Sequence, residues 1–405
     1  MNILGIYGAL GWDGNIPYDI KHLCDFWVHG SGATLIVNGE LKTSISEERF
    51  SRIKHDGNYP ELSIQNILDY NKLTKQDIDV VVYVAGAPVM SHGLKEQGYT
   101  ENKIKEYFPN CNVEFLYHHL AHSAATFYTS GFDEANILTF DGAGCHEGGA
   151  HEQWLIPHLK FSQGTGSTIS VIASEYHGIP PMYNSFGNFY NYFTKIVYKN
   201  KMMQEGVFEQ RPYDREAYPG KVMGLAAFGD YQKINLPDVY ELKTQREVKE
   251  SKISLPKWVQ KKHIQDDKNY IIWEDCFPQL YNSPELDNYS EEDLLKLNPE
   301  NLASWAQYQF EKYLLLFLSH IPKEIKRDNL CLGGGCALNI LANTKILEQG
   351  IYKNVHINTA PDDSGLHLGA ALYKAVEYEN KISLPDDIGY LGIPYTDEDI
   401  EVVLC

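Results

Sequence analysis

The sequence lacks the features of a secreted, disulfide-bonded or membrane-spanning protein. It has no Cys-x-x-Cys pair, and its seven cysteines are an odd number scattered along the chain, a pattern that favours reduced thiols. Residues 1–5 have neither the charged nor the apolar segment of a secretory signal. No apolar run approaches the length needed to cross a bilayer. The sequence therefore predicts a cytoplasmic protein without membrane contact.

Basic residues are also in deficit. The 405 residues include 54 Asp and Glu against 35 Lys and Arg, which gives a formal net charge of −19. General nucleic-acid binding is therefore not expected, because phosphate contacts need clustered cations, although a small basic pocket is compatible with this balance. The hydrophobic share of 43% is ordinary for a globular protein, and the length allows one large core or two moderate ones.

Four short motifs, far apart in the chain, carry the residues with the most distinctive chemistry. They are His-His-Leu-Ala-His at 118–122, Asp-Gly-Ala-Gly at 141–144, Gly-Gly-Gly at 333–335 and Asp-Asp-Ser-Gly at 362–365. His118 and His122 are spaced so that a helix places both on one face, close enough to share one metal ion. Carboxylates beside glycine suit a tight turn that a phosphate or substrate can approach.

Three of these motifs also have a purely structural interpretation. The histidine pair could be a surface or core pair, although the apolar segment 121–132 predicts a buried helix in which histidines need partners. Asp141 follows the apolar segment 136–140, at the carboxyl end of an expected strand where α/β sheets bind ligands, but it could be a turn former. Asp363 could simply cap the following helix.

The pattern of apolar residues predicts an α/β protein with two lobes. Strands are expected at 2–7, 80–84, 136–140, 329–332 and 354–358, and a hairpin at 32–46 with an Asn-Gly turn. An apolar stripe over 302–317 predicts a core helix, whereas 231–298 reads as an irregular insertion. We expect lobes at 1–130 and 131–405, each ribonuclease-H-like, on the two-lobed plan of actin and hexokinase.

A dense charge cluster at 47–56 has two interpretations. Such a cluster is most often the solvated face of a helix. However, Arg49, Arg52 and Lys54 lie near glycine-rich segments, where cations could meet an anionic ligand.

Taken together, the motifs resemble the O-carbamoyltransferases of the nodulation, cephamycin and aminoglycoside antibiotic type. The matching segments are 47–56, 118–124, 141–144, 220–229, 333–339, 390–392 and 397–400. The resemblance spans nearly the whole chain, and its combined specificity is high although each motif alone is weak. More distantly, the chain is similar to the tRNA threonylcarbamoyltransferase family.

The resemblance implies an enzyme that moves a carbamoyl group from carbamoyl-adenylate, made from carbamoyl phosphate and ATP, to the hydroxyl of a small-molecule or nucleoside acceptor. The implied ligands of Fe(II) or Zn(II) are His118, His122, Asp141 and Asp363. Lys54 would offset charge that develops in the transition state, and His29 would be the base for the acceptor hydroxyl. The implied nucleotide contacts are Lys221, Gly333, Gly334, Gly335 and Asn339.

The chain departs from the family pattern in three ways. His29-Gly30 stands where the family has His-Asp, and segment 11–28 is an expected insertion on the acceptor side. The family's C-terminal domain that forms carbamoyl-adenylate is expected to be absent, so a separate domain or subunit is an implied partner. The alternatives are a transferase of the tRNA threonylcarbamoyl type and a non-catalytic actin-like ATP-binding protein.

Overall fold

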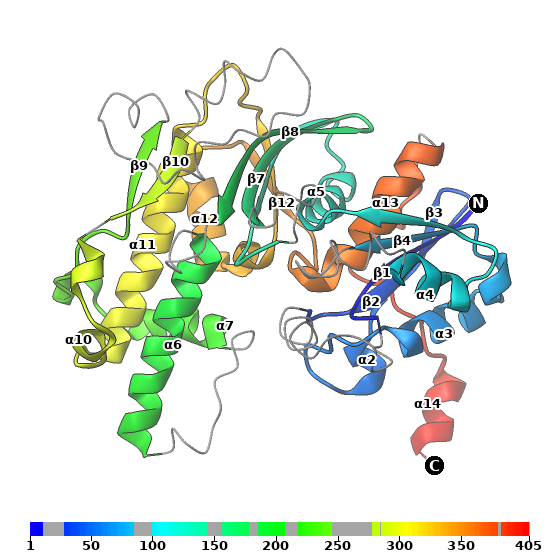
Figure 1. The fold of residues 1–405 in the computed structure, drawn as a ribbon, viewed down its shortest axis with the longest axis horizontal. Helices are drawn as coiled ribbons and strands as arrows, with labels where there is room; N and C mark the ends of the chain where they lie inside the picture. The colour runs from blue at the N-terminus through cyan, green and yellow to red at the C-terminus, as the bar shows by residue number, and fades with distance from the viewer. Residues whose placement is uncertain are drawn as a thin grey trace. The chain divides into compact units, whose positions relative to one another are not determined.

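The chain forms two compact units in a computed structural model (Figure 1). The structure describes residues 1–10, 28–84, 99–144, 156–177, 185–206, 218–244, 278–283, 285–379 and 382–404. The first unit comprises Met1–Gly131 with Asn358–Cys405, and the second comprises Phe132–Ile357. The expected lobes joined residues 358–405 to the second unit. The structure differs because helix α13 (Leu366–Glu379) packs on the sheet of the first.

The first unit is built on a five-stranded sheet of order β3-β2-β1-β4-β5. Its strands are β1 Asn2–Tyr7, β2 Gly32–Val37, β3 Glu40–Ser46, β4 Val80–Val84 and β5 Asn112–Leu116. The first three strands are antiparallel, and β1, β4 and β5 are parallel. Asn38 and Gly39 both have positive φ angles, 49° and 74°. This is the two-residue turn that the Asn-Gly pair predicts for the hairpin.

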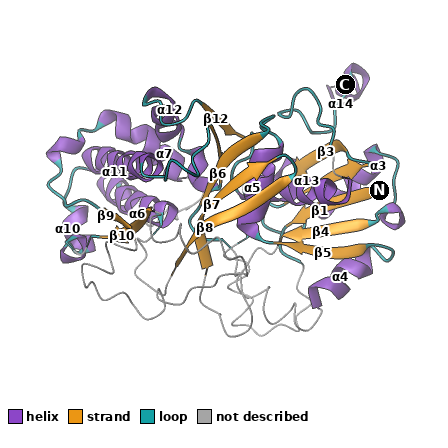
Figure 2. Ribbon diagram, turned by 90° about the horizontal axis from the view of Figure 1, so that it is seen from above, coloured by secondary structure: helices purple, strands orange, loops and turns teal. Residues whose placement is uncertain are grey.

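The described helices of this unit are α2 Glu48–Ser51, α3 Glu61–Tyr70, α4 Tyr99–Tyr107, α5 His118–Tyr128, α13 Leu366–Glu379 and α14 Asp397–Leu404, and its short 3₁₀ turns are η1 Lys75–Asp77 and η8 Asp363–Gly365. Four of these helices cover the two faces of the sheet. Alternation along β1 divides the core: Leu4 and Ile6 pack with α3 and α4, whereas Ile3 and Tyr7 pack with α5 and α13. The helices α5 and α13 lie side by side on the second of these faces (Figure 2).

The second unit repeats the same plan. Its sheet has the order β12-β11-β6-β7-β8. The strands are β6 Glu134–Phe140, β7 Ile156–Thr165, β8 Thr168–His177, β11 Asn329–Gly333 and β12 Asn354–Ile357. Numbered from one to five within each sheet, both units have the order 3-2-1-4-5, with the first three strands antiparallel and the fourth and fifth parallel to the first. This repeat confirms the predicted α/β fold with two ribonuclease-H-like lobes.

The remaining elements of the second unit are helices, short 3₁₀ turns and a two-stranded antiparallel sheet. They are α6 Phe186–Glu205, α7 Tyr218–Leu225, α10 Glu291–Leu295, α11 Pro299–Ser319 and α12 Ile340–Glu348, the 3₁₀ turns η4 Ala226–Phe228, η5 Tyr231–Lys233, η6 Leu286–Asn288 and η7 Gly335–Leu338, and the strands β9 Tyr240–Thr244 and β10 Pro278–Asn282. Helix α11 is the predicted core helix and packs along α6 (Figure 1).

The irregular insertion expected at 231–298 and the acceptor-side insertion expected at 11–28 fall partly outside the described residues. Within 231–298, the described parts carry the β9–β10 pair and short helices, so they are more regular than predicted. The reason is burial, because Tyr240 and Leu294 belong to the core of the second unit. Segment 245–277 and the expected insertion, except residue 28, lie outside the described residues. Among the described helices, none combines the length and apolar character of a membrane span.

His367 anchors α13 to the first sheet. Its ring is buried, its Nδ1 lies 2.7 Å from Oγ1 of Thr34 on β2, and burial lowers its pKa from 6.5 to about 4. A Cβ on Gly32 would lie 2.4 Å from Nε2 of His367, so only glycine fits opposite the ring. The ring is therefore held neutral in the folded chain at neutral pH.

Acid should destabilise the protein through His367. Between pH about 6.5 and about 4 the unfolded chain binds a proton on this ring that the folded chain does not, so stability falls as the pH falls. A shift of this size corresponds to about 3 kcal/mol of unfolding free energy. Urea unfolding across this range should show a steeper loss for the wild type than for His367→Asn. Parallel pH profiles for the two proteins would contradict the assignment.

Candidate functional site

Helix α5 positions the histidine pair. Strand β5 ends at Leu116, and after Tyr117 the helix begins at His118, so His118 and His122 lie one turn apart on one face. Both side chains are buried, with 2% and 1% exposure, and their Nε2 atoms are 3.1 Å apart. The predicted helical placement of the pair is therefore correct, and the two rings meet edge to face, with an interplanar angle of 78°.

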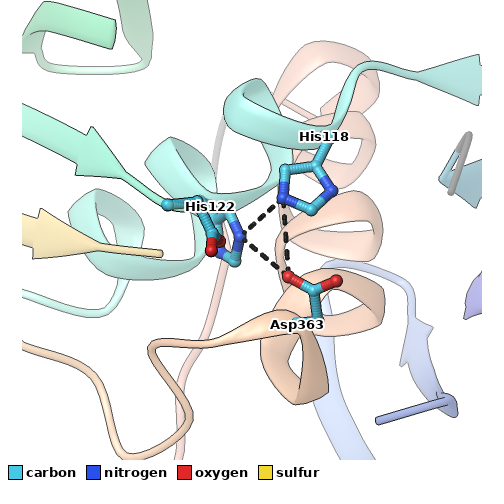
Figure 3. A group of neighbouring side chains, drawn as sticks. His118, His122 and Asp363 are labelled. Atoms are coloured by element: carbon cyan, nitrogen blue, oxygen red, sulfur yellow. Dashed lines mark hydrogen bonds and ion pairs between the residues drawn. The ribbon is translucent and has the colours of Figure 1, made fainter. Parts of the chain in front are cut away.

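Asp363 reaches this pair from the turn before α13 (Figure 3). Its Oδ1 lies 3.5 Å from Nε2 of His118 and 3.4 Å from Nε2 of His122. The capping role that the sequence left open for Asp363 belongs to its neighbour, because the carboxylate of Asp362 accepts the Ser364 N–H at 3.2 Å. Asp363, the next residue, directs one carboxylate oxygen to the two histidines instead.

The three atoms form a triangle of a size that suits a metal ion. Ligand atoms bound at 2.0–2.1 Å around a tetrahedral ion are about 3.3 Å apart, and the sides observed here are 3.1, 3.4 and 3.5 Å. Two buried ring nitrogens and one carboxylate oxygen that converge in this way are poorly matched by a single shared proton, whereas a cation would attract all three. Two histidines with one carboxylate suit iron(II) and zinc.

The second oxygen of Asp363 faces two further residues. Its Oδ2 accepts a hydrogen bond from the Tyr7 hydroxyl at 2.8 Å and lies 3.7 Å from Nε2 of His29. His29, the expected base, is therefore beside the histidine–aspartate cluster and is 24% exposed. Sequence reasoning missed Tyr7. Its position as the last residue of the expected strand at 2–7 was the indication available from the sequence.

The backbone holds the predicted cationic loop against the segment that carries His29. Ser31 donates its N–H to the carbonyl of Asp56 at 2.7 Å, and a Cβ at Gly57 would lie 2.0 Å from the carbonyl of Val28. Lys54 itself is exposed in a turn within this loop. Its predicted contact with the reacting group stays a prediction.

The charge cluster at 47–56 is partly structural. The carboxylate of Glu47 is buried and accepts the N–H groups of Leu62 and Ser63, at 3.0 and 2.7 Å, at the start of α3. Arg52 has a φ of 61°, an unusual conformation for a non-glycine residue, and is exposed. The cluster therefore combines a helix cap with exposed cations.

In the second unit, the Asp-Gly-Ala-Gly and Gly-Gly-Gly loops follow the neighbouring parallel strands β6 and β11. The carboxylate of Asp141 joins the loops, accepting the N–H of Gly142 at 2.7 Å and of Gly335 at 3.1 Å. Gly334 has a φ of +90°, and a Cβ there would lie 2.3 Å from the carbonyl of Phe140, so the tight approach needs glycine. The expected role of Asp141 as a metal ligand stays a prediction.

The other expected nucleotide contacts have partners of their own. Asn339 caps α12 through the N–H of Ala342 at 3.1 Å, and its amide exchanges two hydrogen bonds with Gln307, at 2.9 and 3.0 Å. Lys221 is exposed on α7, with its Nζ 4.2 Å from the centre of the Tyr218 ring. The structure gives Asn339 a structural role, and its contact with a nucleotide stays a prediction.

Solved structures similar to this chain include two of HypF. The HypF of T. kodakarensis aligns with a TM-score of 0.49 and 15% identity, covering 94% of this chain and 48% of that chain. A full-length HypF in its phosphate- and nucleotide-bound form aligns with a TM-score of 0.48 and 14% identity, covering 87% of this chain and 46% of that chain.

Curated relatives are longer than this chain. Uncharacterized protein sll1178 of Synechocystis is 27% identical over 93% of this chain and 61% of its own length. Nodulation protein NolNO of Sinorhizobium fredii is 26% identical over 93% of this chain and 50% of its own length. The chain thus spans between half and about three fifths of these two relatives. The family described as carbamoyltransferase N-terminus matches residues 94–372, and the chain belongs to this family.

Proposed function

We propose that this chain carries the transfer site of a metal-dependent carbamoyltransferase. The donor is carbamoyl-adenylate, made from carbamoyl phosphate and ATP, and the acceptor is a hydroxyl of a small molecule or nucleoside. The observation that carries the proposal is the buried triangle of His118, His122 and Asp363 in a chain of the carbamoyltransferase N-terminus family. Iron(II) or zinc held there would act as a Lewis acid toward the carbamoyl carbonyl or the phosphate oxygens.

His29 is the proposed general base. Its imidazole is partly exposed and adjoins the carboxylate of Asp363, which would stabilise the ring once it has accepted a proton. The acceptor oxygen forms a bond to the carbamoyl carbon, the bond from that carbon to the oxygen of the adenylate phosphate breaks, and AMP leaves. The acceptor proton passes to His29. Lys54 would offset negative charge on the departing phosphate.

The glycine loops of the second unit are the proposed nucleotide cradle. Both loops stand at the carboxyl ends of parallel strands, the edge at which open α/β sheets bind their ligands. Gly333, Gly334 and Gly335 let the backbone approach a ligand closely, and Lys221 would contact a phosphate. We also propose that carbamoyl-adenylate is formed by a separate domain or subunit that corresponds to the part of the relatives beyond the match.

The test is a transfer assay with the metal-loaded protein. Carbamoyl-adenylate is supplied together with a panel of sugars and nucleosides, and carbamoylated product and AMP are measured by mass spectrometry. His29→Ala should lower the turnover rate by about 10²–10⁴-fold, the usual contribution of a general base, and should leave nucleotide affinity unchanged. An equal rate in His29→Ala would refute its role as base. A protein that binds AMP and metal but carbamoylates none of the panel would contradict the proposed reaction.

A further inference from the structure

The two oxygens of Asp363 have different surroundings. Oδ1 faces the two histidines of α5 at 3.5 and 3.4 Å. Oδ2 points to β1, where the hydroxyl of Tyr7 donates a hydrogen bond at 2.8 Å. His29 is 3.7 Å from the same oxygen, beyond hydrogen-bond length, so Tyr7 supplies the short contact. The carboxylate is thereby fixed with one oxygen toward the ligand cluster and the other toward the sheet.

The fold holds Tyr7 rigidly in this role. It is the last residue of β1, its side chain has 0% exposure, and it belongs to the core cluster that joins the sheet to α13. The residue opposite it on β2 is Gly32, which adds no side chain to compete for the space. A phenol is a donor at neutral pH, and its bond to a carboxylate is charge-assisted and stronger than a neutral one.

Without this donor the buried carboxylate would lose one of the contacts that hold its orientation. Rotation about its Cβ–Cγ bond would then let either oxygen, or both, approach an ion. If the carboxylate did not rotate, Oδ2 would remain buried without the hydrogen bond from Tyr7. Groups that hold metal ligands in place in this way usually contribute 10–100-fold to affinity. Neither the family match nor the motif resemblance assigns a function to Tyr7.

We propose that Tyr7 is a positioning residue that makes Asp363 a one-oxygen ligand of the metal. The inference rests on the metal site of the proposed function. It predicts that Tyr7→Phe, which removes only the hydroxyl, weakens metal binding without removing any ligand. Tyr83→Phe is the matched control, because Tyr83 on β4 is also buried and its hydroxyl donates at 2.6 Å to the carbonyl of Gly8.

The experiment measures the affinity of the purified protein for Zn²⁺ by competition with a chelator, and the visible absorption of the protein loaded with Co²⁺. Tyr7→Phe should bind Zn²⁺ about 10–100-fold more weakly and change the Co²⁺ spectrum, because a carboxylate that binds through both oxygens raises the coordination number. Tyr83→Phe should match the wild type in both measurements. Thermal unfolding of both variants would measure how much stability is lost when a buried hydroxyl is removed.

The outcomes separate this inference from the proposed function. A wild-type protein that binds neither Zn²⁺ nor Co²⁺ would overturn the metal site and this inference with it. Tight binding by the wild type, with Tyr7→Phe equal to it in affinity and spectrum, would overturn the role of Tyr7 alone. Equal weakening in Tyr7→Phe and Tyr83→Phe would likewise overturn it, because the hydroxyls would then act only through stability.

Discussion

Replacing His122 with alanine is expected to remove the bound metal from the protein. Its Nε2 is one corner of the triangle, 3.1 Å from Nε2 of His118 and 3.4 Å from Oδ1 of Asp363. Changes to residues that only support a ligand lower metal affinity by about 10–100-fold, so loss of a ligand should exceed about 100-fold. Elemental analysis of protein purified without chelators should find about one iron or zinc per wild-type chain and almost none in the variant.

The control for this experiment is His119→Ala. His119 lies on the same helix and is equally buried, with 0% exposure, but its ring is not one of the three converging groups. It should retain the ion even if its stability falls. Loss of metal from both variants would indicate that α5 had unfolded locally. Retention of metal by His122→Ala would exclude the proposed ligand set, and with it the proposed mechanism.

The local parts of this site were predictable from sequence. A helical period of 3.6 residues sets His118 and His122 on one face, whatever the rest of the chain does. The Asn-Gly turn and the apolar strands followed from residue types with strong backbone preferences, and these places in the structure agree with prediction. The repeated strand order of the two sheets depends on which strands pair, and the apolar pattern only suggested that pairing.

The tertiary parts were not predictable in the same way. Neither composition nor spacing distinguishes Asp362 from Asp363, and only the geometry of the turn shows that Asp362 caps it while Asp363 faces the histidines. In the sequence, Tyr7 is one more residue of an apolar strand. Its role could not be predicted because Asp363, which accepts the hydrogen bond from its hydroxyl, lies 356 positions away. Likewise, α13 follows the strands of the second unit in sequence but packs with the first, since long-range contacts decide its place.

A substitution at Gly369 is also expected to have a large effect on stability and metal binding. This residue sets the distance between α5 and α13, the two helices that hold the ligands in position. Helix α5 carries both histidines, and α13 begins shortly after Asp363. A Cβ at Gly369 would lie 1.9 Å from the carbonyl oxygen of Ala121 and 2.6 Å from its carbonyl carbon. These are backbone atoms of the residue just before His122, so the clash cannot be relieved by a side-chain rotation.

Gly369→Ala should therefore destabilise the protein, although alanine normally favours a helix over glycine by about 1 kcal/mol. Overpacking of this kind typically lowers the free energy of unfolding by about 1–3 kcal/mol, and it should push α5 and α13 apart. The separation should also weaken Zn²⁺ binding, because the triangle needs both helices in place. The measurements are urea unfolding of the metal-free protein and Zn²⁺ affinity.

Gly224→Ala on α7 is the matched helical control, since a Cβ there meets no atom within 4 Å in the described part of the chain. Its stability should stay the same or rise by up to about 1 kcal/mol. A Gly369→Ala protein as stable as Gly224→Ala would show that α5 and α13 are not in tight contact. A destabilised Gly369→Ala protein with unchanged Zn²⁺ affinity would show instead that the ligand geometry does not depend on the spacing of the helices.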